Sequence, residues 1–232
     1  MKRIPLSGRH PALEERAAVL YSDALPYHNF AHVQDTLAAA EKILARCQAE
    51  HIRTDAEVVY YALLFHDAGY QENHLACGYL SKESYSAALA SAVLTEFAAP
   101  PSQIDKCTAA ILATERDGKF ISAEQKAVRA ADLSGLAADY AVFLDSSLKL
   151  KREHELLHGK SLAWADWQAV SDEVLRHYLS QEIRLTSYFY DENGESTFHA
   201  RVRENLERLL AEPSEPSRPV VVARCVADPQ QD

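Results

Sequence analysis

Apolar residues recur with a helical period along most of the chain. The clearest case lies between residues 30 and 50, where apolar side chains return every three or four positions: Val33, Leu37, Ala40, Ile43 and Leu44. The same period predicts further helices over residues 11–25, 54–68, 81–97, 102–114, 122–132, 137–157, 164–179 and 197–210. The pattern therefore predicts an all-α fold.

Polar residues and glycines mark where several of these helices begin and end. Thr54 with Glu57, and Ser122 with Gln125, have the spacing of capping boxes at helix starts. Ser81 predicts the start of another helix, because its hydroxyl can accept an orphan backbone N–H. Gly69 predicts a helix end, since glycine readily adopts the left-handed conformation found there.

The chain shows no internal repeat and no strong boundary before residue 212. Residues 185–190 are the one short run that resembles a strand, and we expect a loop or helix there instead. Residues 1–211 are therefore predicted to form one domain, a helical bundle with additional C-terminal helices. Residues 212–232 are predicted to form a flexible tail, because four prolines punctuate them: Pro213, Pro216, Pro219 and Pro229.

Composition supports a helical globular protein and limits its partners. Of the 232 residues, 47% are hydrophobic and only 7 are Gly, which favours a sizeable core built from helices. A formal net charge of −10 disfavours binding to a long nucleic acid, because the surface repels phosphates. A small phosphorylated ligand is still compatible, since a bound metal ion reverses the local field.

Targeting and cysteine patterns predict a cytoplasmic protein without a membrane segment. The first twenty residues carry several charges and no apolar core of a signal peptide, and no window approaches the roughly 18 apolar residues that span a bilayer. The 4 cysteines form no Cys-x-x-Cys pair, which disfavours a thiolate zinc site and fits a reducing compartment. We expect them to be small core residues: Cys47, Cys77, Cys107 and Cys225.

Candidate chemistry begins with His66-Asp67, which ends an otherwise apolar helix. Buried polar groups there cost free energy unless they find hydrogen-bond partners. A carboxylate at a helix C-terminus also faces the unfavourable end of the helix dipole. A nearby cation would relieve both problems, whereas the alternative is a His–Asp pair hydrogen-bonded within the core. His32 near one helix start and Asp132 in a small, apolar helical run are two more isolated polar candidates.

Together these residues offer two imidazoles and two carboxylates from three separated helices. That donor set suits Mg²⁺, Mn²⁺ or a six-coordinate transition metal with open positions for water and a phosphate oxygen. A metal lowers the pKa of a bound water and makes hydroxide available near neutral pH.

The order of the motifs resembles the HD superfamily of metal-dependent phosphohydrolases. The resemblance covers roughly residues 27–180 and rests on five short segments: YHNFAH (27–32), FHDAGY (65–70), KESYSA (82–87), ILAT (111–114) and ADL (131–133). Residues 151–153 and 164–167 also resemble the bacterial branch with a long helical C-terminus. Several matches in the right order are more specific than any one alone.

The resemblance implies an HD-type bundle that holds one divalent metal ion, which could be Mn, Mg, Fe, Co, Ni or Zn. The implied ligands are His32, His66, Asp67 and Asp132. It also implies hydrolysis of a phosphomonoester or phosphodiester, commonly of a nucleotide, by a metal-bound hydroxide. Lys82 stands where many relatives place a histidine, and a protonated Lys cannot ligate, so a single metal is favoured.

Further roles follow as hypotheses. Asp67 could orient or deprotonate the attacking water, and Glu83 could carry a proton to the leaving group. The candidate substrate contacts are His28, Asn29, Lys82 and Thr114. Each has a structural alternative. His28 and Asn29 could support the metal ligands from behind, Lys82 and Glu83 could be solvated residues at a helix start, and Thr114 could bond back within its helix.

Rival functions stay open at this point. A non-catalytic sensor could keep the metal, bind a nucleotide and signal through its acidic tail. A guanosine tetraphosphate hydrolase is less favoured, because Ala68-Gly69-Tyr70-Gln71 stands where that branch has an acidic pair. A purely structural helical protein without metal is the third alternative, and the sequence leaves the oligomeric state open.

Overall fold

Helices dominate the part of the chain that the computed structural model describes, which is residues 10–187 and 190–217. These residues contain no strand. They form α1 (Pro11–Ala18), α2 (Phe30–Ala49), α3 (Ala56–Phe65), α4 (Lys82–Glu96), α5 (Pro101–Leu112), α6 (Ala123–Asp132), a 3-10 helix η1 (Leu133–Ala137), α7 (Tyr140–His158), α8 (Trp164–Leu179) and α9 (Thr197–Ala211). The predicted all-α class is confirmed.

Side-chain caps define several helix starts. The Ser81 and Ser122 hydroxyls accept the N–H groups of Ser84 and Gln125, as capping at these positions requires. The predicted cap of α3 at Thr54 is wrong, because Asp55 is the N-cap and its carboxylate accepts the N–H of Val58. An Asp competes well for this position, so the real boundary lies one residue later.

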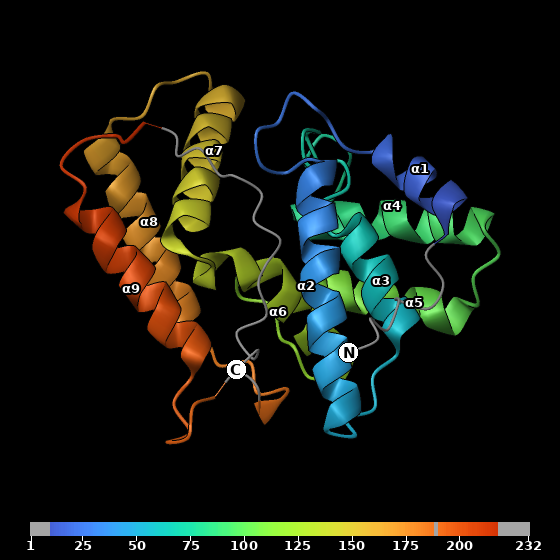
Figure 1. The fold of residues 1–232 in the computed structure, drawn as a ribbon. Helices are drawn as coiled ribbons and strands as arrows, with labels where there is room; N and C mark the ends of the chain where they lie inside the picture. Colours follow the sequence, from blue (N-terminus) through green and yellow to red (C-terminus); the bar gives the residue numbers. More distant parts are fainter. Residues whose placement is uncertain (1–9, 188–189, 218–232) are drawn as a thin grey trace.

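The N-terminal bundle, comprising α1 to α6, surrounds the larger hydrophobic core. α3 runs through its interior and is buried on nearly all sides. Its buried residues are Val58, Val59, Tyr60, Ala62, Leu63, Leu64 and Phe65. α2, α5 and α6 pack around α3 (Figure 1). A helix that is apolar all round needs this central position, because any exposed face would lose hydrophobic stabilisation.

The C-terminal layer, comprising α7, α8 and α9, has a smaller hydrophobic core of its own. Phe143, Leu144, Leu175, Val202, Leu206 and Leu209 form this cluster. In Figure 1 the layer stands on one side of α6 and the remaining helices of the bundle on the other. Polar contacts join the two parts, including Ser187 to the Glu50 carboxylate and the Lys126 ammonium to the Arg184 carbonyl.

Residues 185–190 and the segment after α9 form no α-helix or strand where the structure describes them. Tyr190 makes one isolated bridge with Ser196, while Tyr188 and Phe189 lie outside the described residues. After α9, the Glu212 carbonyl accepts the Trp164 indole N–H, and Glu215 pairs with Lys151. Residues 218–232, most of the predicted tail, lie outside the described part of the chain.

The fold shows where the cysteines lie and how apolar the helices are. The predicted core position is confirmed for Cys47 and Cys107, which are buried. It is wrong for Cys77, which is exposed in the turns between α3 and α4, and Cys225 lies outside the described residues. None of the helices described is both long enough and apolar enough to cross a membrane.

Candidate metal centre

Three separate helices bring the four predicted ligands together at one place. His32 lies in the first turn of α2, and Asp132 is the last residue of α6. His66 and Asp67 directly follow α3. The ligands converge because α2, α3 and α6 pack against one another.

The donor atoms are close enough to share one ion. The His32 and His66 Nε2 atoms are 3.4 Å apart, and each lies 3.4 Å from Asp132 Oδ1. Asp67 Oδ2 lies 3.0 Å from His66 Nε2 and 3.6 Å from His32 Nε2. Two atoms bound to one ion at about 2.1 Å cannot be more than about 4.2 Å apart, so these spacings fit a metal.

The cluster is sheltered but keeps contact with solvent. The His66 side chain is 1% exposed, whereas Asp67 and Asp132 are 17% and 21% exposed. His32, His66 and Asp132 together form a group that could hold a metal ion. An ion there would be enclosed by the imidazoles and reachable from the side of the carboxylates.

Electrostatics within the cluster favour a positive charge between the carboxylates. Burial by itself would raise the pKa of Asp67, but His66 and His28 hold it at about 2. The pKa of Asp132 is also lowered against the effect of burial, chiefly by hydrogen bonds with His32 and His66. Burial opposes the charged form of His66, yet Asp67 and Asp132 raise its pKa well above the ordinary value. A divalent cation would satisfy the same carboxylates.

Contacts behind the ligands orient the imidazoles. His66 Nδ1 donates to the Leu63 carbonyl at 2.8 Å, which leaves Nε2 facing the other ligands. Asn29 is the N-cap of α2: its Oδ1 accepts the N–H of Ala31 at 2.9 Å and its Nδ2 donates to the Leu25 carbonyl at 2.8 Å. These contacts fix the turn that presents His32, and the predicted substrate role of Asn29 stays a prediction.

A cation and an acid from α4 lie beside the metal centre. The Lys82 ammonium lies 3.3 Å from the centre of the Tyr70 ring. Burial raises the pKa of Glu83, and the nearby charges of Glu115 and Asp67 add to this shift. The charge of Asp67 influences the pKa of both α4 residues, and Lys82 is linked to the site through Tyr70, which stacks on His28.

His28 also lies at this site and contacts a residue that sequence reasoning did not single out. Its ring stacks on Tyr70, with 3.7 Å between ring centres, and its Nδ1 contacts the Glu153 carboxylate. The sequence assigns no role to Glu153, which lies in a segment that carries only a family resemblance. The Thr114 hydroxyl donates to the Ile111 carbonyl at 2.7 Å, which is a bond back to the last turn of α5. The predicted contact of Thr114 with substrate stays a prediction.

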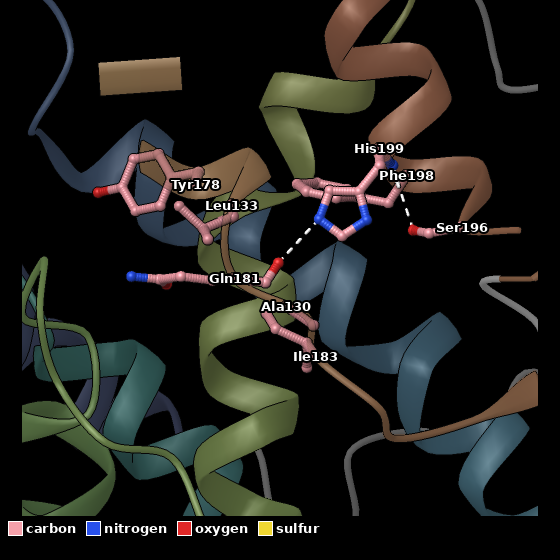
Figure 2. A pocket seen from close by; sticks show the side chains of 8 residues that line it. All are labelled: Ala130, Leu133, Tyr178, Gln181, Ile183, Ser196, Phe198 and His199. Atoms are coloured by element: carbon pink, nitrogen blue, oxygen red, sulfur yellow. Dashed lines mark hydrogen bonds between the residues drawn. The ribbon is translucent and has the colours of Figure 1, made fainter. Parts of the chain in front are cut away.

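An apolar cavity lies between the end of α6 and η1 on one side and residues 178–199 on the other. Figure 2 shows its lining side chains: Ala130, Leu133, Tyr178, Gln181, Ile183, Ser196, Phe198 and His199. Ala130 of α6 and Leu133 of η1 line one side of it, and none of the four predicted ligands is among its lining residues. The cavity volume is about 30 Å³, which is too small for a nucleotide base. We therefore place the candidate chemistry at the polar cluster.

Comparison of the chain with models of known protein families and with curated proteins found no match. The family suggested by the order of the motifs therefore stays a prediction.

Proposed function

We propose that this protein is a metal-dependent phosphohydrolase that cleaves a phosphate ester of a small substrate, such as a nucleotide. The observation that carries the proposal is the convergence of His32, His66 and Asp132 on one point, with Asp67 Oδ2 3.0 Å from His66. A bound divalent ion would supply an activated water and neutralise charge on phosphoryl oxygens.

The surrounding side chains supply the remaining functions of such a site. Lys82 is a positive charge beside Asp67 and can meet a phosphate oxygen that points away from the metal. Glu83 has a raised pKa, so a larger fraction of it is protonated near neutral pH. That property suits a group that gives a proton to a leaving oxygen.

The first test combines metal content with turnover. Protein purified without an affinity tag is assayed for bound metal, then with Mn²⁺, Mg²⁺, Co²⁺ or Ni²⁺ against nucleotides, cyclic nucleotides and p-nitrophenyl phosphate esters. We expect metal-dependent hydrolysis that falls by about 100-fold or more in Asp132→Asn, since even outer-shell changes cost 10–100-fold. Asp105→Asn, an exposed carboxylate on α5, is the matched control and should keep full activity.

Other outcomes would replace the proposal. Activity that is equal in Asp132→Asn and in the unchanged protein would come from a contaminant or another site. Tight, metal-dependent nucleotide binding without turnover would indicate a sensor. Absence of bound metal, with no thermal stabilisation by any added metal, would indicate a structural protein.

A further inference from the structure

Glu153 on α7 reaches across the molecule to the turn that precedes α2. Its side chain is 2% exposed. One oxygen, Oε2, accepts the backbone N–H groups of Tyr27 and His28, both at 2.9 Å. The other oxygen, Oε1, contacts His28 Nδ1. Both oxygens of this buried carboxylate therefore bind Tyr27 and His28, which makes the turn before α2 the specific partner of Glu153.

The contact with Glu153 determines which nitrogen of His28 carries the proton. An ionised carboxylate only accepts hydrogen bonds, so Nδ1 must be the donor. Burial opposes ionisation of Glu153, but its hydrogen bonds with His28 lower its pKa and keep it charged. Nε2 on the far edge of a neutral His28 ring then carries a lone pair. It makes no hydrogen bond with any residue in 10–187 or 190–217.

Tyr70 fixes the plane of the His28 ring. The two rings are nearly parallel, at 11°, with centres 3.7 Å apart, and the Lys82 ammonium lies 3.3 Å from the centre of Tyr70. Two groups this near to one ring centre would overlap on a single face, so His28 and Lys82 lie on opposite faces of Tyr70. Tyr70 therefore holds His28 and Lys82 in a fixed position relative to each other.

We propose that Glu153 is a positioning residue that holds His28 in its Nδ1–H form, so that Nε2 accepts a hydrogen bond from an O–H group of the substrate. The proposal rests on the proposed function for the identity of that substrate. It gives the C-terminal layer a direct part in the site, because α7 carries Glu153 while the metal ligands all lie in or next to α2, α3 and α6. In Figure 1 the turn before α2 faces α7.

Glu153→Gln is the informative variant. Its single carbonyl oxygen can keep the two backbone N–H groups, and its NH₂ group then faces His28 Nδ1. That nitrogen must become the acceptor, and the proton moves to Nε2. Asp145→Asn is the matched control, since Asp145 is a buried carboxylate on the same helix that pairs with Lys149.

The tautomer is measured by long-range ¹H–¹⁵N NMR on histidine-labelled protein, with the His28 signals assigned through His28→Gln. We expect Nδ1–H in the unchanged protein and in Asp145→Asn, and Nε2–H in Glu153→Gln. Protonation of Nε2 alone, or of both nitrogens, in the unchanged protein would overturn the assignment. So would a tautomer that Glu153→Gln leaves unchanged while circular dichroism shows a folded protein.

A second measurement tests whether His28 Nε2 faces the substrate. With a hydrolysed substrate, we expect Glu153→Gln to lower kcat by about 10-fold or more while the metal affinity stays within about twofold. An unchanged kcat with a switched tautomer would refute the proposal. If no substrate is turned over, inorganic phosphate is titrated with Mg²⁺ present. A shift of the His28 Nε2 signal in the unchanged protein supports the proposal, and its absence overturns it whatever the protein's function.

Discussion

Gly69 shows how closely one residue near the metal centre is fitted. It follows Asp67 by two positions, has a φ of +73°, and a Cβ atom placed on it would lie 2.6 Å from Tyr85 Cε1 and 2.9 Å from Leu89 Cδ1. Both the backbone conformation and the lack of space therefore require glycine. Gly69 lies within the turn of residues 66–71, which contains His66 and Asp67.

We predict that Gly69→Ala destabilises the protein by about 2–4 kcal/mol, the sum of roughly 1 kcal/mol for the left-handed backbone and 1–3 kcal/mol for overpacking. Urea denaturation measures the loss. Gly159→Ala is the control, because Gly159 also has a positive φ, +61°, but no atom lies within 4 Å of its Cβ position. Equal losses in the two variants would show that the contacts with Tyr85 and Leu89 do not matter.

The candidate ligands could be predicted from sequence, whereas their supporting residues could not. His66-Asp67 stands out because polar residues at the end of an apolar helix need a partner, and Asp132 stands out in the same way. Glu153 lies in a charged run, Lys-Arg-Glu-His-Glu, that reads as a solvated helix face. Its burial depends on docking against a turn more than a hundred residues away, which no local pattern reports.

At the scale of the element, caps decide where helices begin, and competing caps limit prediction. Thr54 and Asp55 are neighbours that both suit the N-cap of α3, and the chain uses Asp55. Ser122 with Gln125 has no such competitor, and the predicted capping box of α6 is present. α1 ends at Ala18 and not near residue 25, because the following residues form turns that lead to α2.

The contacts of Glu155 with the turn between α7 and α8 should make the stability of the fold decrease at acid pH. The Glu155 carboxylate accepts the N–H of Leu162 at 2.9 Å and pairs with Lys151 at 2.8 Å. These hydrogen bonds lower the pKa of Glu155 from 4.5 to about 2. Since the folded state holds this proton less tightly than the unfolded state, the contribution is complete above about pH 4.5 and is lost as the pH falls toward 2.

We predict that Glu155→Gln destabilises the protein at pH 7 and that this difference shrinks as the pH is lowered from 4.5 toward 2. Urea midpoints of both proteins across that range measure it. Glu207→Gln, on the exposed side of α9, is the control and should follow the unchanged protein. A difference that stays constant with pH would mean that the amide loses packing or geometry and not an ionic contact.

At the scale of the molecule, two hydrophobic cores meet across a boundary that contains both apolar and polar contacts. Arg129 of α6 illustrates this boundary: it is buried, donates to the carbonyls of Ala113, Glu115 and Arg116, and also contacts the Gln181 side chain at 2.6 Å. The sequence predicted a bundle with additional helices but not this division. Helical periodicity identifies the buried face of each helix without indicating which core it joins.

Residues 212–217, which follow α9, bind side chains of both α7 and α8. The Glu212 side chain accepts the Tyr140 hydroxyl at 2.9 Å, and its carbonyl accepts the Trp164 indole N–H at 3.1 Å. Glu215 lies 2.9 Å from the ammonium of Lys151, whose side chain is only 5% exposed. Removing the segment would leave these half-buried donors and a nearly buried charge with fewer partners, which costs free energy.

We predict that a chain ending at Ala211 is less stable than one ending at Ser217 by about 2–4 kcal/mol. It loses the hydrogen bonds that Tyr140, Trp164 and Gln168 donate to Glu212, and the ion pair of Lys151 with Glu215. Thermal unfolding of the two truncated proteins measures the difference. Because His32, His66, Asp67 and Asp132 all belong to the N-terminal bundle, the increase in Tm on adding metal should be similar in both. If the shorter chain is equally stable, the contacts of Glu212 and Glu215 add nothing. If it instead loses the response to metal, the C-terminal layer shapes the metal centre itself, and the division into a ligand-bearing bundle and a supporting layer is wrong.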